Sequence, residues 1–341
     1  MAQLTIALDI MGGDHGPLVI LAAAIRAVEK HSHCQFVLCG DQAVIRPALE
    51  PLSNEQLSRI EVEHCEQVVL MDEKPTQALR NKKQSSMRRA LELVAEGRAD
   101  ACVSAGNTGA LMAMAFYVLK TLPGIDRPAL VTAMPTASHH RVFLLDLGAN
   151  VNCDSEALFQ YGVMGTVLAQ QCARIDNPRV ALLNVGEEDI KGNAQVKYAD
   201  QLFRNAESIN YIGYVEGDDI FTDVADVVVT DGFTGNVALK SSEGLAKLVI
   251  NEVRRVSQQN WYTRLLAKIS LPLLKSIYTR VNPDQYNGAS LLGLRGIVVK
   301  SHGNASADAF YYAISQAINE AQMQVPERIK NRIEQVLLEH H

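Results

Sequence analysis

The stretch ADACVSAGNTGALMAMAFYVL, residues 99–119, shows the pattern that decides the fold of the chain. Ala99–Ser104 is apolar apart from Asp100 and the terminal Ser104 and has the length of a strand, as expected for a strand that is buried on both faces. The loop Ala105–Gly109 contains two glycines, and Ala110–Leu119 is apolar and long enough for a helix. A buried strand, a glycine-containing loop and a helix form the repeating unit of parallel sheets that helices cover on both faces. The stretch therefore indicates an α/β fold.

The same unit recurs along the whole chain. Further strands are predicted at Leu4–Asp9, Gln35–Cys39, Ile60–His64, Val142–Asp146, Val180–Asn184, Val227–Thr230 and Gly296–Lys300. Helical segments follow several of them, including Leu18–Lys30, Gln84–Glu96 and a helix from Val237. We expect a three-layer α/β fold with a doubly wound, mostly parallel sheet. No linker rich in Pro, Gly or Ser interrupts residues 1–337, so we expect one domain, of one or two lobes. Residues 338–341, LEHH, resemble the remnant of a purification tag.

Composition limits the possible functions. The 341 residues are 48% hydrophobic and 21% charged, which is typical of a globular protein with its own core. The formal net charge of −6 argues against general nucleic-acid binding, which requires a basic surface. The six cysteines form no C-x-x-C pair and no zinc-binding spacing, so we expect reduced thiols and neither metal nor other cofactor. The sequence has no signal peptide and no apolar run that could span a bilayer, which predicts a cytoplasmic protein.

Two glycine-containing loops resemble each other, Gly106–Gly109 (GNTG) and Gly232–Gly235 (GFTG). Each follows a predicted strand and opens a helical segment, and ligands of such sheets bind beyond the carboxyl ends of the strands. Free amides at a helix N-terminus suit an anion such as phosphate, and Thr108 and Thr234 add hydroxyl donors. A purely conformational role, in which the glycines only form tight turns, stays open. Neither loop has the spacing of a Walker A motif or of a dinucleotide fingerprint.

A cationic segment, Arg80–Ser86 (RNKKQSS), stands just before one of the predicted helices, whose N-cap would be Ser85 or Ser86. Lys82 and Lys83 would neutralise phosphate if they faced the same cleft as the two loops. Charged segments of this kind also occur on solvated surfaces that bind no ligand, and that interpretation stays open.

The segment from Val253 to Pro283 contains no Asp or Glu, although the chain as a whole is acidic. Its apolar residues recur at helical spacing, and Pro272 predicts an interruption of the helix. A basic helix with an apolar face is typical of a helix that lies on anionic lipid. The segment would equally suit an acidic carrier protein or a dimer interface. The residues predicted for this surface are Arg254, Arg255, Trp261, Arg264, Leu265, Lys268, Ile269, Leu273 and Lys275.

Several motifs, taken in order, resemble those of one family, the acyl-acyl-carrier-protein:phosphate acyltransferases of bacterial phospholipid synthesis (PlsX type). The matching motifs are LDIMGGD (8–14), RNKKQSS (80–86), ADACVSAGNTGA (99–110), LLNVGEE (182–188), KGN (191–193), DGFTGNV (231–237) and KSHG (300–303). The resemblance extends from Ile6 to about Ala317. Two positions depart from the family's pattern, namely Asp218, where many relatives have Arg, and Asn287, where many have Gly.

The resemblance implies a fold like those of phosphotransacetylases and isocitrate/isopropylmalate dehydrogenases, and a homodimer associated peripherally with the inner face of the cell membrane. It implies that a long-chain fatty acyl group passes from acyl-acyl carrier protein to inorganic phosphate. The acyl phosphate would then serve a membrane glycerol-3-phosphate acyltransferase in phosphatidic acid synthesis. Phosphate is itself a nucleophile, so the enzyme needs only to hold it against the thioester and to stabilise the tetrahedral oxyanion.

The matching motifs also supply the residues that we expect in the site. For catalysis these are Lys83, Thr234, Asp231 and His302, the last two as candidates for proton handling. The residues expected to bind phosphate or substrate are Asp9, Gly12, Gly13, Asp14, Lys82, Ser85, Ser86, Ser104, Gly106, Asn107, Thr108, Gly109, Asn184, Gly186, Glu187, Lys191, Asn193, Gly232, Phe233, Gly235 and Asn236.

Three other functions fit parts of the sequence. A phosphotransacetylase acting on acyl-CoA would have the same fold, and activity with acetyl-CoA would separate it from an enzyme that uses carrier protein. A nicotinamide-dependent dehydrogenase is disfavoured because no dinucleotide fingerprint occurs. A non-catalytic sensor of acyl carrier protein or phosphate at the membrane would need the basic helix but not the paired threonine loops.

Overall fold

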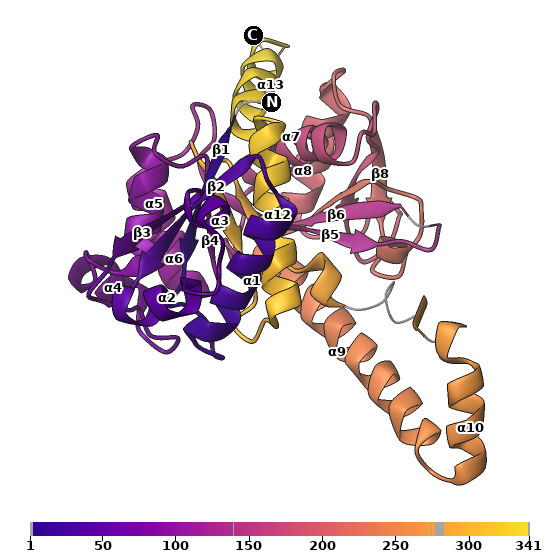
Figure 1. Ribbon diagram of the computed structural model, residues 1–341. Helices are drawn as coiled ribbons and strands as arrows, with labels where there is room; N and C mark the ends of the chain where they lie inside the picture. The colour runs from indigo at the N-terminus through magenta and orange to yellow at the C-terminus, as the bar shows by residue number, and fades with distance from the viewer. Residues whose placement is uncertain (1–2, 139, 274, 277–282, 340–341) are drawn as a thin grey trace.

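The computed structural model describes residues 3–138, 140–273, 275–276 and 283–339. Within these ranges the strands form one eleven-stranded sheet in the order β3-β2-β1-β4-β11-β10-β5-β6-β9-β7-β8 (Figure 1). The strands are β1 (Leu4–Asp9), β2 (Cys34–Gly40), β3 (Ile60–His64), β4 (Ala101–Ser104), β5 (Ala129–Pro135), β6 (Arg141–Leu145), β7 (Val180–Leu183), β8 (Tyr211–Val215), β9 (Val227–Val229), β10 (Ala289–Leu292) and β11 (Ile297–Lys300).

Helices occupy most of the connections between the strands. The α-helices are α1 (Pro17–Lys30), α2 (Gln42–Leu49), α3 (Asn54–Leu57), α4 (Pro75–Asn81), α5 (Ser86–Ala95), α6 (Thr108–Leu119), α7 (Ser155–Cys172), α8 (Ala194–Asn205), α9 (Gly232–Ser257), α10 (Trp261–Ile269), α12 (Ala307–Gln322) and α13 (Val325–Glu339). Two short 3-10 helices are η1 (Asp219–Phe221) and η2 (Pro283–Tyr286). His340 and His341 of the presumed tag remnant lie outside the described residues.

The sheet is mixed, and its two halves run in opposite directions. Strands β3, β2, β1, β4 and β11 are parallel to one another, as are β6, β9, β7 and β8. At the centre β10 is antiparallel to both β11 and β5, and β5 is antiparallel to β6. The prediction of a mostly parallel sheet is confirmed, but β4 and β9, which precede the two matched glycine loops, run in opposite directions.

The alternation of side chains along the strands shows which helices cover each face of the sheet. Ala7 packs with α5 and α6 in one hydrophobic cluster, whereas its neighbours Ile6 and Leu8 pack with α1 and α12 in another. In the other half of the sheet, Leu144 points into the first cluster and Leu145 packs against α7 and α13. Helices α5 and α6 thus belong to one outer layer, and α1, α12, α7 and α13 to the other. The predicted three-layer, doubly wound α/β architecture is confirmed.

Most predicted elements agree with the structure to within about two residues, but α9 begins five residues earlier than predicted. The reason is Asp231, whose Oδ1 accepts a hydrogen bond from the amide of Thr234 at 2.9 Å and so caps the helix at Gly232. The second glycine loop is therefore the first turn of a helix. Ser85 caps α5, as one of the two alternatives predicted, because its hydroxyl accepts from the amide of Arg88.

Helices α9 and α10 project from the body of the molecule as a hairpin (Figure 1). The turn between them ends at Asn260, which caps α10 through a capping box with Thr263. As Pro272 predicted, the helix is interrupted, since α10 ends at Ile269. The last part of the predicted basic stretch, residues 277–282, lies outside the described residues. No helix in the described part of the chain has the length and apolar character needed to cross a bilayer.

Candidate active site

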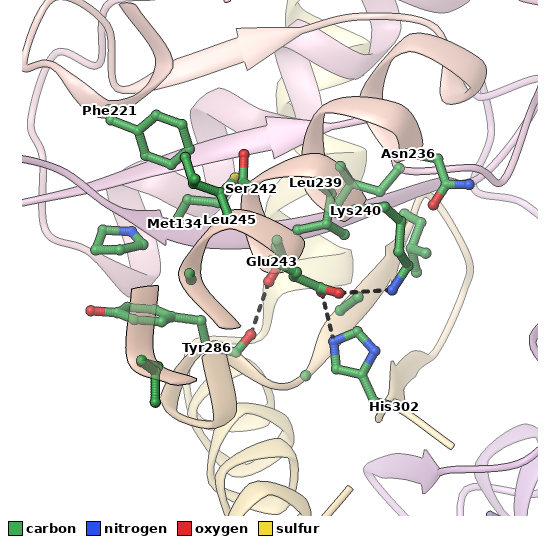
Figure 2. A pocket seen from close by; sticks show the side chains of 18 of the residues that line it. Met134, Phe221, Asn236, Leu239, Lys240, Ser242, Glu243, Leu245, Tyr286 and His302 are labelled. Atoms are coloured by element: carbon green, nitrogen blue, oxygen red, sulfur yellow. Dashed lines mark hydrogen bonds and ion pairs between the residues drawn. The ribbon is translucent and has the colours of Figure 1, made fainter. Parts of the chain in front are cut away.

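A cavity of about 870 Å³ lies between strand β5, helix α9 and the loops that follow β4 and β11. Figure 2 shows that polar and apolar side chains gather at different parts of it. The polar side chains at one end belong to Thr108, Asn236, Lys240, Glu243, Lys300 and His302. The apolar wall includes Met134, Phe221, Leu245, Ala246, Val249, Ile250 and Val253. The cavity can therefore hold a ligand with a charged head and a long apolar tail.

Lys300 is the most deeply buried charged group in this cavity wall, with 7% of its surface exposed. Its ammonium group donates to the carbonyl of Ser301 and lies 3.5 Å from that of Ala105. Burial lowers the pKa of Lys300 to about 8, although the charges of Asp14 and Asp9 oppose the change. Near neutral pH the group is therefore mostly a cation, held in a weakly solvated place where an anion would be strongly attracted.

A buried cluster around Asp9 supports this part of the cavity from behind. The hydroxyl of Ser104 donates to Asp9 Oδ2 at 2.6 Å, and Ser86 also hydrogen-bonds to this carboxyl. Burial raises the pKa of Asp9, and these hydrogen bonds act against the rise. A Cβ at Gly12 would lie 2.7 Å from the backbone nitrogen of Gly106, so the close packing of these two loops requires glycine at position 12. Asp9, Ser86 and Ser104 thus shape the loop rather than line the cavity.

Glu243 joins helix α9 to the loop after β11. Its carboxylate lies 3.2 Å from His302 Nε2 and 3.0 Å from Lys240 Nζ (Figure 2). Although burial alone would raise the pKa of Glu243, its hydrogen bonds and charge pairing with His302 and Lys240 lower it to about 2. The carboxylate is therefore ionised at neutral pH and orients both partners towards the polar end of the cavity.

Asn287, one of the two departures from the family pattern, fixes the backbone beside His302. Its side-chain amide donates to Ser301 Oγ at 2.7 Å and to the Ala309 carbonyl at 2.8 Å. Its side-chain oxygen accepts from the backbone amide of His302 at 2.9 Å. The other departure, Asp218, is exposed beside η1.

The first glycine loop brings a helix N-terminus to the cavity. Asn107 caps α6, since its Oδ1 accepts from the Ala110 amide at 3.0 Å. Its amide group donates to the carbonyls of Met71 and Glu73 at 2.8 and 2.9 Å, which fixes the loop against the segment before α4. Thr108 is the first residue of α6 and lines the cavity. The positive end of the helix dipole therefore lies at the polar end of the site.

The second glycine loop contributes Asn236 to the cavity, but not Thr234. The Thr234 hydroxyl donates instead to Asp231 Oδ2 at 2.8 Å, and Phe233 is exposed. A side chain at Gly235 would lie 2.0 Å from the Asp146 carbonyl, so glycine is required for the close approach of α9. The structure thus gives Asp231 a capping role, and the predicted catalytic roles of Asp231 and Thr234 stay predictions.

The predicted cationic segment lies near the first loop but does not line the cavity within the described part of the chain. Lys82 Nζ is 4.0 Å from the carboxylate of Glu73, and Lys83 is exposed. The Ser85 hydroxyl donates to the Lys82 carbonyl at 2.7 Å.

In the loop that follows β1, Gly12 packs against Gly106, and the amide of Asp14 donates to the carbonyl of Gly303 at 2.7 Å.

The loop after β7 is likewise not part of the cavity lining. Lys191 pairs with Glu188 at 2.7 Å, and the Asn184 side chain donates to the Gly186 carbonyl at 3.0 Å. Asn193 caps α8. Of the expected catalytic and phosphate-binding residues, Thr108, Asn236 and His302 line the cavity, and a ligand role for the others stays a prediction.

The chain also matches known proteins. A family model described as fatty acid synthesis protein matches residues 4–328. A phosphate acyltransferase of Pseudoalteromonas atlantica is 58% identical over 339 residues, which cover 99% of each chain. This chain belongs to the phosphate acyltransferase family. A phosphate acyltransferase of Shewanella sp. strain W3-18-1 is 56% identical with the same coverage, and the expected enzyme class is thereby confirmed.

Solved structures with low sequence identity share the fold. A phosphotransacetylase of Streptococcus pyogenes superposes with a TM-score of 0.63 at 19% identity and covers 94% of both chains. A 4-hydroxythreonine-4-phosphate dehydrogenase of Klebsiella pneumoniae gives a TM-score of 0.51 at 15% identity, covering 94% of this chain and 100% of its own. The resemblance to the phosphotransacetylase fold is confirmed, and these similarities extend to the fold alone.

Sequence reasoning missed three charged residues of the cavity, Lys240, Glu243 and Lys300. Lys300 opens the quoted motif KSHG, but nothing in its sequence neighbourhood distinguishes a buried lysine from an exposed one. Lys240 and Glu243 stand three residues apart on α9, a spacing typical of surface ion pairs. Only the contact of Glu243 with His302, from a distant part of the chain, reveals the place of this pair in the site.

We expect Lys300→Met to lower acyl-phosphate formation by about 100- to 1,000-fold, the loss typical for one donor to a developing oxyanion. Because the cation is the active form, wild-type kcat/KM should fall as the pH rises through about 8, the pKa of Lys300. Steady-state rates between pH 6 and 9 measure both effects.

Lys30→Met, an exposed lysine at the end of α1, is the matched control and should leave the rate unchanged. Lys83→Ala and Thr234→Ala test the predicted roles of these residues in the same assay. Full activity of Lys300→Met would remove Lys300 from the site.

Proposed function

We propose that the enzyme transfers a long-chain fatty acyl group from acyl-acyl carrier protein to inorganic phosphate. The observation that carries this proposal is a single cavity with a cationic end at Lys300 and Lys240 and a long apolar wall along α9. Phosphate fits the cationic end, where it would also meet the N-terminus of α6. The acyl chain fits the apolar part.

The dimensions of the cavity favour a long acyl chain over an acetyl group. The residues of α9 that line it extend from Asn236 to Arg254, and Lys240 and Val253 alone are about 20 Å apart along the helix axis. A volume of about 870 Å³ lies near the upper end of the range for small-molecule sites. An acetyl group would leave nearly all of the apolar wall in contact with water, so acetyl-CoA would gain little from it.

In the proposed reaction an oxygen of bound phosphate attacks the thioester carbonyl carbon. A C–O bond forms, the C–S bond breaks, and the phosphopantetheine thiolate leaves with the electron pair. The Lys300 ammonium and the hydroxyl and amide groups at Thr108 are the donors for phosphate or for the developing oxyanion. Orientation of the two reactants could supply about 7–11 kcal/mol of the lowering of the barrier. His302, held by Glu243, is the group placed to exchange a proton with phosphate.

The hairpin of α9 and α10 is the proposed surface for the acidic carrier protein and the membrane. No residue of α10 is buried, and Trp261, Ile269 and Leu273 expose 76%, 68% and 63% of their surface. The segment that begins at Val253 also carries basic side chains, and it contains no Asp or Glu. Apolar area gives binding to the lipid interface, and the cations attract anionic headgroups.

The same proposal includes the expected homodimer. Leu248 of α9 is 63% exposed and does not line the cavity, so it offers an apolar side chain to a second copy. Sedimentation of the purified protein measures this state directly. Peripheral association with the inner face of the cell membrane, and supply of acyl phosphate to a membrane glycerol-3-phosphate acyltransferase, are the cellular expectations that follow.

The proposed reaction is tested by incubating the enzyme with palmitoyl carrier protein and labelled phosphate. We expect a labelled acyl phosphate that hydroxylamine destroys. Acetyl-CoA in place of the palmitoyl carrier protein should give little product. Equal or greater activity with acetyl-CoA would instead identify a phosphotransacetylase.

Ala246→Trp should block the apolar part of the cavity and lower transfer of a palmitoyl group at least about tenfold, while an acyl group of four carbons is transferred normally. The matched control is Lys247→Trp, because Lys247 is the next residue of the same helix, is exposed and does not line the cavity. Rates with the two carrier-protein substrates measure the effect. Equal losses with both substrates would argue against an acyl site along α9.

Leu265→Glu combined with Leu273→Glu should release the protein from vesicles that contain anionic lipid, because carboxylates at the interface oppose both apolar insertion and attraction to the headgroups. Flotation of the variant with such vesicles measures the loss. Leu18→Glu with Leu70→Glu, two exposed leucines outside the hairpin, is the control and should float as wild type does. Unchanged flotation of the hairpin variant would contradict the membrane proposal.

A further inference from the structure

A second cavity, of about 220 Å³, lies beside the reaction cavity. Both cavities include Thr132, Tyr286 and Gly288 in their walls, near the point where β10 begins. The remaining wall of the second cavity comes from β6, β10, α7 and one side of α12. It is separate from the acyl-binding wall of α9, since no residue of α9 lines it.

The second cavity is lined mainly by polar side chains, and several of their donors are unused. Arg141, which is exposed, and the partly buried Tyr312 and Asn319 line it, and none of their side chains makes a hydrogen bond or an ion pair with a described residue. The Arg141 guanidinium only lies over the ring of Tyr286, 5.9 Å from its centre. These donors border one small space, and a ligand rich in acceptor oxygens would satisfy them.

The charge of the cavity favours an anion. Arg141 is the one charged residue in its described lining, and no carboxylate lines it. An acid behind the wall is Glu320, whose Oε1 accepts from the lining residues Gln316, at 2.8 Å, and Ser290. Burial raises the pKa of Glu320 to about 7, so it repels an anion less than a fully ionised carboxylate would.

A direct hydrogen-bonded path connects this cavity to the reaction cavity. Asn287 lines the second cavity, and its side chain holds Ser301 Oγ and the backbone amide of His302, which line the first. A ligand that moves Asn287 therefore moves the backbone that carries His302. The path depends on the side chain of Asn287, because a glycine at this position could make neither hydrogen bond.

We propose that the second cavity is a regulatory site for a small oxyanion, a hydroxy acid or a phosphate monoester. A cavity of about 150 Å³ holds a benzene molecule, so 220 Å³ holds a ligand somewhat larger than that. Arg141 supplies the charge-assisted hydrogen bonds, Tyr312 and Asn319 bind further oxygens, and Asn287 transmits occupancy to His302.

The test measures binding by isothermal titration calorimetry, with tartronate as the hydroxy acid probe and 2-phosphoglycolate as the phosphate monoester. We expect one of the two to bind, and Arg141→Gln to weaken that binding at least about tenfold, as expected for a lost charge-assisted hydrogen bond. Tyr312→Phe, which keeps the ring, should weaken it several-fold. Arg46→Gln, at an exposed arginine of α2, and Lys300→Met, in the reaction cavity, should bind as wild type does.

Regulation of the enzyme through the second cavity is measured as a change in KM or kcat for acyl transfer when the probe is bound. This change should occur in the wild type and be absent in Arg141→Gln and Asn287→Gly. Binding is measured without turnover, so failure of the proposed acyl donor would not affect it. The proposal is overturned if neither probe binds, if Arg141→Gln and Tyr312→Phe bind as tightly as wild type, or if binding leaves acyl transfer unchanged.

Discussion

The buried ammonium of Lys300 constrains the whole site. A charge in an apolar wall is costly unless other groups compensate it, and here two backbone carbonyls and the more distant Asp9 and Asp14 provide part of that compensation. These partners come from loops after β1, β4 and β11, which are neighbours in the sheet. The close packing of those loops, at glycines that leave no room for a side chain, brings the partners together. Phosphate would complete the compensation, so binding the nucleophile and stabilising the cation are the same event.

Helix α9 gives the site its second property, an apolar extension. Its first turns bring Asn236 and Lys240 to the polar end, and its later turns leave the body of the molecule with α10 (Figure 1). One face of the helix therefore lines the cavity while other residues, such as Leu248, remain exposed. An acyl chain lying along this helix would lead from the phosphate site towards the surface proposed for membrane and carrier protein. Helix α9 thus contributes both to the polar end of the cavity and to the apolar wall proposed for the acyl chain.

Much of the fold could be predicted from the sequence, because buried parallel strands and their helices leave strong local patterns. Strands such as Ile60–His64 were located to the residue, whereas β10 was missed because four residues beside a glycine carry little periodicity. The reversal of the second half depends on the antiparallel pairings of β10 and β5, and β5 was not predicted either. The site was less predictable for a related reason. Asp231 and Asn107 have the residue types of both ligands and helix caps, and Lys300 is distinguished only by burial, which depends on contacts across the whole sheet.

Asn287 shows how a single departure from a family pattern can change what a site depends on. With glycine at this position, the backbone amide of His302 and the hydroxyl of Ser301 would need water or another group as their partner. In this chain one side chain satisfies both and also binds the carbonyl of Ala309 at the start of α12. The position of His302 is therefore coupled to α12, whose side chains form one wall of the second cavity. Any control exerted from α12 would therefore depend on the side chain of Asn287.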